Sequence, residues 1–262
     1  MRVQVVTVNH GTSAYADLLL RSLIAHHRLS PDLSILLLDN DSGDVERLDW
    51  AKGFGVEIRP SGYSLEAAVT THGEILRDAV LAEPDCDAYL FVDSDVCFTT
   101  GDTIGTMAAE LAADPTLFAV EAGWAHEDGK LFQHSALTGT SRIRESVRFE
   151  GADWCDPYEF DIGYGDRVHP FCALVRNDAP FRTTVTELGL SPALTYCVRG
   201  ALFFDTLGLL TQIMKTHGRT WRRSSKSVIH FGNASWQSTP EDGKAARRDA
   251  LLHTYRQFSD QH

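Results

Sequence analysis

The chain is poor in cationic residues and has no cluster of them. Its 262 residues include 24 Lys and Arg against 36 Asp and Glu, a formal net charge of −12, and no run of Lys or Arg forms a stripe. Contacts to a polyanion need clustered cations, so a nucleic acid is not an expected partner. A small anionic ligand is still compatible with this net charge if a metal ion or a helix N-terminus offsets the negative charge of the ligand.

Cysteine pairs and long apolar runs are also missing. The five cysteines are widely spaced without a C-x-x-C pair, which argues against a disulfide framework or a zinc knuckle and suits a reducing compartment. No stretch approaches the roughly 18 uninterrupted apolar residues of a membrane span. The opening segment lacks the long apolar core of a signal peptide. We therefore expect no membrane span and a cytoplasmic location.

The first hundred residues instead alternate between strand and helix patterns. The expected strands span 3–8, 34–38, 56–59 and 88–92, and the expected helices span 15–27 and 66–81. This alternation predicts an α/β fold with a mostly parallel central sheet flanked by helices. Ligands of such sheets bind beyond the carboxyl ends of the strands, where Asn9, Asp39 and Asp93 stand. We expect these three polar segments to meet in one crevice.

The later part of the chain gives a weaker pattern. It predicts helices at 103–113, 203–217 and 241–258, and strands at 117–123, 171–175 and 227–231. Residues 124–170 hold many aromatic, acidic and glycine residues with little periodicity. A long irregular stretch inside a compact domain is often functional.

The most informative motif is Asp93-Ser94-Asp95, directly after an apolar strand. Residues two apart on an extended chain face the same side, so the two carboxylates lie close together. Two ionised carboxylates repel each other unless a cation or strong donors separate them, and hard divalent cations prefer oxygen ligands. The motif therefore indicates a divalent metal site; the alternative is a solvated acidic turn.

Two further segments carry polar groups at strand ends. The loop that starts at Asp39 fails as an EF-hand, because its sixth and twelfth positions hold Asp44 and Trp50 in place of Gly and Glu. Asp39 can instead accept a hydrogen bond from a ring N–H such as a uracil imide, or belong to a capped turn. His230 is either a core histidine or a third ligand beside aspartate oxygens, a mixture that manganese accepts more readily than magnesium.

Taken in their order along the chain, these motifs resemble those of the nucleotide-sugar glycosyltransferases of the GT-A fold, especially the inverting family 2. The matching segments are Thr7-Val8-Asn9, 39–44, Asp93-Ser94-Asp95, the late helix 203–218 and 230–235. The resemblance implies a single domain, with a nucleotide-sugar-binding half (1–100), an acceptor and catalytic half (101–236) and a helical tail (237–262). It also implies Mn²⁺ or Mg²⁺, a UDP-, dTDP- or GDP-sugar donor, an acceptor that the sequence does not name, and inversion.

The resemblance assigns roles by position. It implies that the nucleobase pocket is lined near Val8 and Asn9 and that Asp39 recognises the base. It also implies that Asp93 and Ser94 lie near the ribose and the metal, and that Asp95 and His230 are metal ligands.

An inverting transfer also needs a general base. In the family this is an acidic residue, often in a Glu-Asp pair, whereas this chain has Phe204-Asp205. Asp205 is the first candidate, with an ordinary helix N-cap as the alternative. Asp166, at the end of an acidic aromatic stretch, is the second. Trp124, Trp154 and Trp236 are candidates for an acceptor channel or for buried packing.

Other functions fit parts of the pattern. A haloacid-dehalogenase-like phosphatase would use Asp93 as nucleophile and Asp95 as general acid, but its motif usually follows the first strand, and here two strand-loop units come earlier. A sugar-nucleotide pyrophosphorylase would need a glycine-rich basic loop after the first strand. A non-catalytic nucleotide-sugar-binding module would keep Asp39 and Asp95 without a base.

Overall fold

The computed structural model describes residues 1–27, 32–66, 71–83, 85–126, 130–131, 143–147, 158–162, 167–187, 189–190, 195–198, 201–204, 206–232, 234 and 243–259. Within these residues, eight strands form a central sheet in the order β3-β2-β1-β4-β9-β6-β12-β5. They are β1 (Val3–Asn9), β2 (Leu33–Asp39), β3 (Val56–Pro60), β4 (Ala88–Val92), β5 (Val96–Phe98), β6 (Leu117–Ala125), β9 (Cys172–Arg176) and β12 (Thr220–His230). Only β9 and β5 run antiparallel to their neighbours, so the expected α/β class is confirmed.

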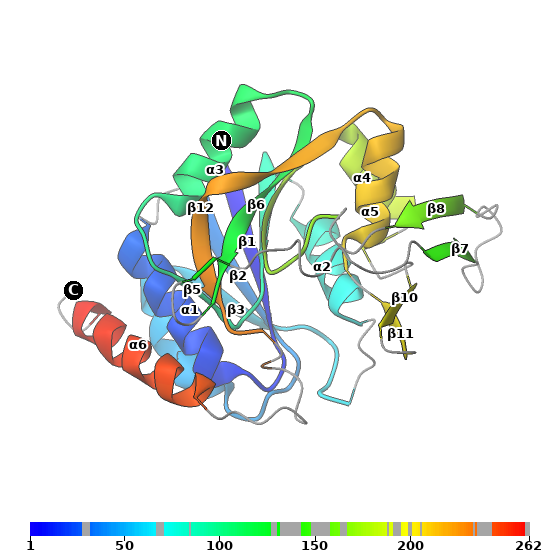
Figure 1. The fold of residues 1–262 in the computed structure, drawn as a ribbon. Helices are drawn as coiled ribbons and strands as arrows, with labels where there is room; N and C mark the ends of the chain where they lie inside the picture. Colours follow the sequence, from blue (N-terminus) through cyan, green and yellow to red (C-terminus); the bar gives the residue numbers. More distant parts are fainter. Residues whose placement is uncertain are drawn as a thin grey trace.

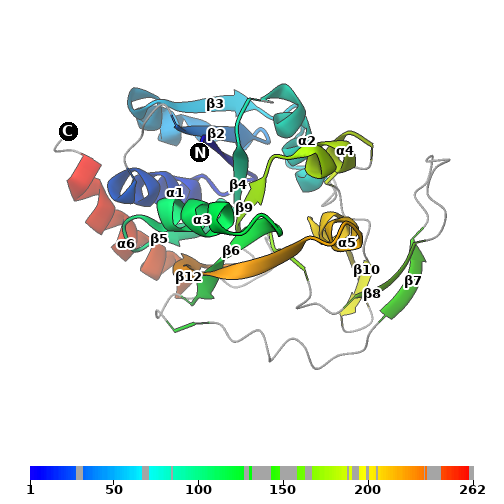
Figure 2. The same cartoon turned by 90° about the horizontal axis from the view of Figure 1, so that it is seen from above.

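Helices cover both faces of this sheet (Figures 1 and 2). Those on one side are α1 (Ser13–His26), the 3₁₀ helix η1 (Val45–Phe54), α3 (Thr103–Ala113) and, outside α1, α6 (Lys244–Ser259); those on the other are α2 (Thr71–Ala82), α4 (Ala179–Glu187) and α5 (Gly208–Thr216). Two antiparallel strand pairs lie on the α5 side, β7 (Ile143–Val147) with β8 (Tyr158–Ile162) and β10 (Thr195–Val198) with β11 (Ala201–Phe204). No helix in the described part of the chain is long and apolar enough to cross a membrane.

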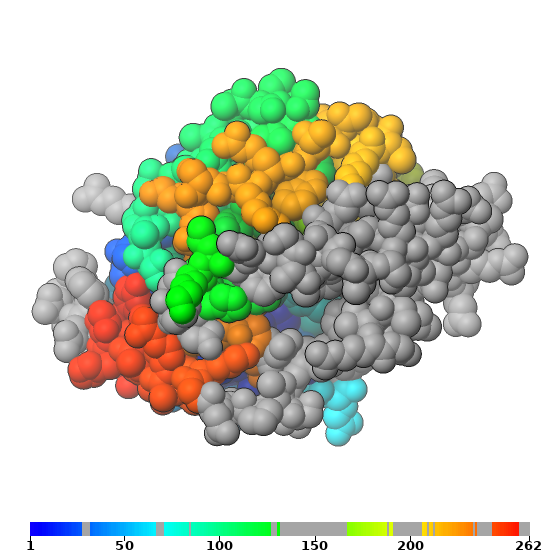
Figure 3. Space-filling model, viewed as in Figure 1, coloured from blue at the N-terminus to red at the C-terminus, as the bar shows by residue number. Residues whose placement is uncertain are grey.

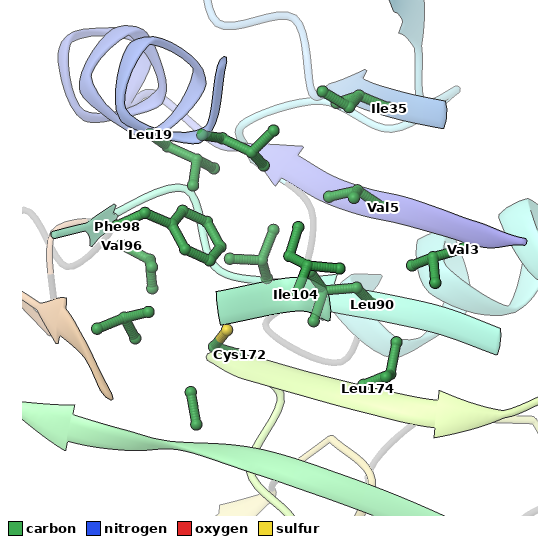
Figure 4. Close-up of a cluster of buried hydrophobic side chains, with 14 of the residues drawn as sticks. Val3, Val5, Leu19, Ile35, Leu90, Val96, Phe98, Ile104, Cys172 and Leu174 are labelled. Atoms are coloured by element: carbon green, nitrogen blue, oxygen red, sulfur yellow. The ribbon is translucent and has the colours of Figure 1, made fainter. Parts of the chain in front are cut away.

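The alternating side chains of the strands fill two apolar layers. On the α1 and α3 side, Val5, Leu90 and Leu174 point from three neighbouring strands toward Leu19 and Ile104 of the helices (Figure 4). All five are buried, and each such side chain contributes roughly 1.5–3 kcal/mol to stability by its removal from water. This packing holds the strand ends, and therefore the polar residues at them, in fixed positions.

Several expected elements have different bounds in the structure. The helix expected at 203–217 is wrong at its start, because residues 201–204 form β11 and α5 begins only at Gly208. The short last strand expected at 227–231 is an eleven-residue strand, β12. Residue 66, the expected start of the next helix, lies in a turn, and the described part of that helix is Thr71–Ala82. By contrast, α3 occupies the expected range 103–113.

The sheet register explains how distant residues meet. Asn9 is paired with Asp39 in the parallel β1–β2 ladder, so both emerge at the same edge. The chain then turns after β4, and β5 pairs antiparallel with the end of β12, which sets His230 opposite Val96. Residues 93–95 form the turn between β4 and β5. His230 is therefore placed beside that turn, although about 135 residues separate them along the chain.

Candidate metal and nucleotide site

Asp93, Asp95 and His230 form the one group of metal-ligand type found among the described residues. One ligand atom from each lies within 4.8 Å of the others. His230 Nε2 is 3.1 Å from Asp95 Oδ1 and 3.5 Å from Asp93 Oδ2. Ligands bound at about 2.1 Å on adjacent octahedral positions lie roughly 3 Å apart, so these separations suit a single small divalent ion.

Backbone groups fix the two aspartates in this arrangement. The Asp93 N–H donates to the Phe171 carbonyl (3.0 Å) and the Val96 N–H to the Asp93 carbonyl (3.2 Å). Asp95 accepts at its carbonyl from the Phe231 N–H (3.1 Å) and at Oδ2 from the Ala234 N–H (3.3 Å). The turn after β12 thus wraps around the Asp95 carboxylate and leaves Oδ1 facing His230.

Two aromatic residues hold the His230 ring. The Phe171 ring stacks on it with centroids 4.9 Å apart and planes 7° from parallel. The Trp124 ring lies 4.5 Å away, and its Nε1–H donates to the His230 carbonyl (3.0 Å). His230 Nδ1 is buried and has no hydrogen-bond partner in the part of the chain that the structure describes. Packing orients this imidazole, with Nε2 toward the carboxylates.

The electrostatics of the site are those of a tight ion pair. Burial alone would raise the pKa of Asp95, but the His230 charge and the hydrogen bonds from His230 and Ala234 hold it below its usual value. Burial alone would lower the pKa of His230, but Asp95 and Asp93 raise it above its usual value. In the absence of a cation, a proton on His230 therefore offsets part of the carboxylate charge, and a metal would take its place.

A second polar group lies where β1 and β2 end. Asn9 Nδ2 donates to Asp39 Oδ1 (2.7 Å) and to Ser13 Oγ (2.9 Å), while Asn9 Oδ1 accepts from the Thr12 N–H (3.1 Å). Asp39 Oδ2 accepts from the Ser42 N–H (3.1 Å). The Asn9 side chain is fully buried, so it joins the two strands, and Asp39 keeps only its remaining lone pairs for a ligand.

The other residues proposed for the nucleotide pocket are equally built into the scaffold. The Val8 side chain packs in the apolar layer beneath α2, which leaves its backbone at the strand end. Ser94 Oγ lies 2.7 Å from Thr12 Oγ1, and both side chains are buried. This hydrogen bond ties the turn of Asp93 and Asp95 to the start of α1. Because Thr12 also donates to Asn9 Oδ1, the Asp93, Asp95 and His230 group is connected to the polar group at the ends of β1 and β2.

Both candidates for the general base, Asp205 and Asp166, lie outside the described residues, as do Trp154 and Trp236. The described residue after Asp205 is Thr206, which is buried. Its carbonyl accepts from Arg167 Nη1 (3.1 Å) and its hydroxyl lies 3.2 Å from His72 Nδ1. Sequence reasoning singled out neither Phe171 nor the Ala234 N–H, because an aromatic residue on a strand and a backbone amide carry no signal of their own in one sequence.

The fold is similar to that of several solved glycosyltransferases. S. aureus TarS 1-349 superposes with a TM-score of 0.58 at 14% identity, over 96% of this chain and 69% of that one. The mannosyltransferase PcManGT from Pyrobaculum calidifontis, solved with GDP-Man and Mn²⁺, gives 0.58 at 14% identity, over 100% and 64% of the two chains. Glucosyl-3-phosphoglycerate synthase from Mycobacterium tuberculosis gives 0.52 at 16% identity, over 97% and 79%.

This chain has the GT-A fold. At identities of 14–16% the similarity is one of fold, and the chain spans about two thirds of the length of the TarS and PcManGT structures. No protein-family model matches the chain, and no curated protein sequence does. The GT-A fold agrees with the parallel strands in the order β3-β2-β1-β4 and with the polar residues at their carboxyl ends. It does not favour the phosphatase alternative.

Proposed function

We propose that this chain is a metal-dependent glycosyltransferase that transfers a sugar from a nucleoside-diphosphate sugar to an acceptor hydroxyl. The observation that carries the proposal is the meeting of Asp93, Asp95 and His230 beside the carboxyl end of β4 in a GT-A sheet. In this proposal residues 1–100 bind the nucleotide sugar, residues 101–236 hold the acceptor and the catalytic groups, and residues 237–262 form a helical tail.

The donor set supports Mn²⁺ or Mg²⁺ as the cofactor. Two carboxylates and one imidazole nitrogen suit manganese, and the two close carboxylates need a cation between them. Asp95 and His230 would be the principal ligands, with Asp93 beside them. The ion, when bound, supplies charge stabilisation to the leaving diphosphate.

The nucleotide would lie across the ends of β1, β2 and β4. Asp39 supports a nucleobase with a ring N–H, which uracil, thymine and guanine all have, and the Val8 and Asn9 backbone lines the same edge. The solved neighbours include complexes with UDP-GlcNAc, GDP-Man and UDP-Glc. We therefore propose a UDP-, GDP- or dTDP-sugar as the donor.

In the reaction, the acceptor oxygen forms a bond to the anomeric carbon while the bond from that carbon to the diphosphate breaks. The bonding electron pair leaves with the diphosphate, and the hydroxyl proton passes to a general base. Asp205 is the first proposed base and Asp166 the second. Attack from the side opposite the diphosphate gives inversion at the anomeric carbon.

Isothermal titration with UDP, GDP and dTDP, each with and without Mn²⁺, tests the proposal. We expect one diphosphate to bind in a metal-dependent manner, and Asp95→Asn to abolish that dependence. The control is Asp49→Asn, which removes an exposed carboxylate that pairs with Lys52 within η1. Failure of every diphosphate to bind under both conditions would overturn the proposal.

A further inference from the structure

Lys244, the first residue of α6, reaches the turn that follows His230. Its Nζ donates to the Gly232 carbonyl at 2.8 Å. Gly232 has a φ of +66°, a left-handed conformation that suits glycine, and it lies between His230 and Ala234, whose N–H binds Asp95 Oδ2. The ammonium is thus hydrogen-bonded to the same short turn that closes around the Asp95 carboxylate.

The position of Lys244 is fixed by the rest of α6. This helix packs on α1 and is exposed at the lower left of the molecule (Figure 3). Near its far end, the Tyr255 hydroxyl donates to the Phe98 carbonyl (2.8 Å) and lies 2.9 Å from His26 Nε2. Leu252 and Tyr255 are buried against the apolar cluster that also contains Phe231. Lys244 is therefore presented by a docked sixteen-residue helix.

Lys244 lies close to Asp95 and His230. Gly232, whose carbonyl accepts from Lys244 Nζ, is two residues after His230, and the Phe231 N–H between them donates to the Asp95 carbonyl. An ammonium at this position is within electrostatic reach of an anion bound to a metal ion at Asp95 and His230.

A charge count shows why such an anion needs a further cation. A divalent ion is neutralised by the Asp93 and Asp95 carboxylates, while a neutral His230 adds no charge. The diphosphate of a nucleotide sugar carries two negative charges and gains a third when the sugar leaves. The whole chain is strongly acidic, so this developing charge is costly without a nearby cation.

We propose that Lys244 binds the diphosphate of the nucleotide-sugar donor on the α6 side of the metal and stabilises it as it departs. This inference rests on the proposed function and adds to it a site residue in the segment otherwise regarded as a tail. An ammonium has three donors, and the Gly232 carbonyl occupies one, which leaves two for phosphate oxygens.

The test compares Lys244→Met and Lys244→Arg with wild type by calorimetric titration of the preferred nucleoside diphosphate, the corresponding monophosphate, and Mn²⁺ alone. Lys226→Met is the matched control, because Lys226 Nζ also donates to a backbone carbonyl, that of Gly101, away from the turn. We expect Lys244→Met to weaken diphosphate binding at saturating Mn²⁺ at least about tenfold. Lys244→Arg retains most of the affinity, and Lys226→Met retains all of it.

Two further readouts separate binding from a structural role. If Lys244 contacts the diphosphate, the loss in Lys244→Met is larger for the diphosphate than for the monophosphate, and the affinity for Mn²⁺ alone is unchanged. Unchanged diphosphate affinity in Lys244→Met overturns the inference, and so does an equal loss for Mn²⁺ alone, which means that Lys244 only supports the turn. If wild type binds no diphosphate at all, the proposed function itself fails.

Discussion

Mn²⁺ should stabilise the folded chain in a way that depends on Asp95. The three ligands come from the β4–β5 turn and from the end of β12, far apart in sequence, so the unfolded chain has no preformed site. A ligand that binds only the folded state, present at 100 times its Kd, adds about 2.7 kcal/mol to the free energy of unfolding. For a domain of this size, that corresponds to a Tm increase on the order of 5–10 °C.

The assay is a thermal unfolding series at rising Mn²⁺ concentrations. Once the site is saturated, each tenfold increase adds about 1.4 kcal/mol, so Tm rises by equal steps on a logarithmic concentration scale. Asp95→Asn should abolish this rise. Its amide Oδ1 can still accept from the Ala234 N–H, so the turn around residue 95 can keep its shape.

Two results would refute this reasoning. Equal Tm increases in wild type and Asp95→Asn would mean that Mn²⁺ binds elsewhere. If Mn²⁺ raises the Tm of neither wild type nor the Asp49→Asn control, Asp93, Asp95 and His230 do not bind the metal. They would then form a proton-linked ion pair without a metal function.

Two further predictions concern a buried histidine of the fold and the packing around His230. His27 is buried, its Nε2 accepts from the Ile104 N–H (3.3 Å) and its Nδ1 donates to the Leu23 carbonyl (3.0 Å), so protonation would break the first bond. Burial lowers the pKa of His27, so the unfolded chain binds more protons than the folded chain below about pH 6.5. As the pH is lowered through this range, the free energy of unfolding should decrease by at most about 1.4 kcal/mol per pH unit. Urea titrations at several pH values should find a smaller slope in His27→Gln. Trp124→Phe removes the N–H that donates to the His230 carbonyl and should weaken Mn²⁺ binding about tenfold by calorimetry; unchanged affinity would show that ring packing alone orients His230.

The first half of the fold could be predicted from the sequence because its signals are local. Buried parallel strands read as short apolar runs, and a polar residue ends β1 and β2 and directly follows β4. The same reasoning placed α3 at its observed bounds. These elements need no knowledge of a distant partner, since composition and period alone distinguish them.

The second half depends on pairings that no local pattern encodes. The antiparallel β9 inserts between β4 and β6, and the three-residue β5 crosses to the outer side of β12. The 203–217 segment shows helical spacing, yet its start pairs as β11 with β10. There, pairing with the strand just before it in the chain overrode helical propensity, which is why the expected helix start was wrong.

His230 illustrates what a single sequence does and does not contain. Beside apolar residues at a strand end it is indistinguishable from a core histidine, and only the resemblance to GT-A enzymes indicated a ligand. The structure supplies the physical reason, since the β5–β12 pairing sets it opposite Val96 and against two carboxylates. Of the two residues that orient it, Phe171 looks like an ordinary strand residue in the sequence, and Trp124 is there a candidate for an acceptor channel or for buried packing.

The two polar groups of the site differ in charge. Asn9 and Asp39 hydrogen-bond to each other and to the loops around them, so the proposed base pocket is preformed at the ends of β1 and β2. At the other group, the Asp93 and Asp95 carboxylates both face the His230 imidazole, so a bound cation would reduce their mutual repulsion. In the proposed reaction, binding energy from the base pocket would bring the diphosphate to that ion, where differential stabilisation of the leaving group accelerates transfer.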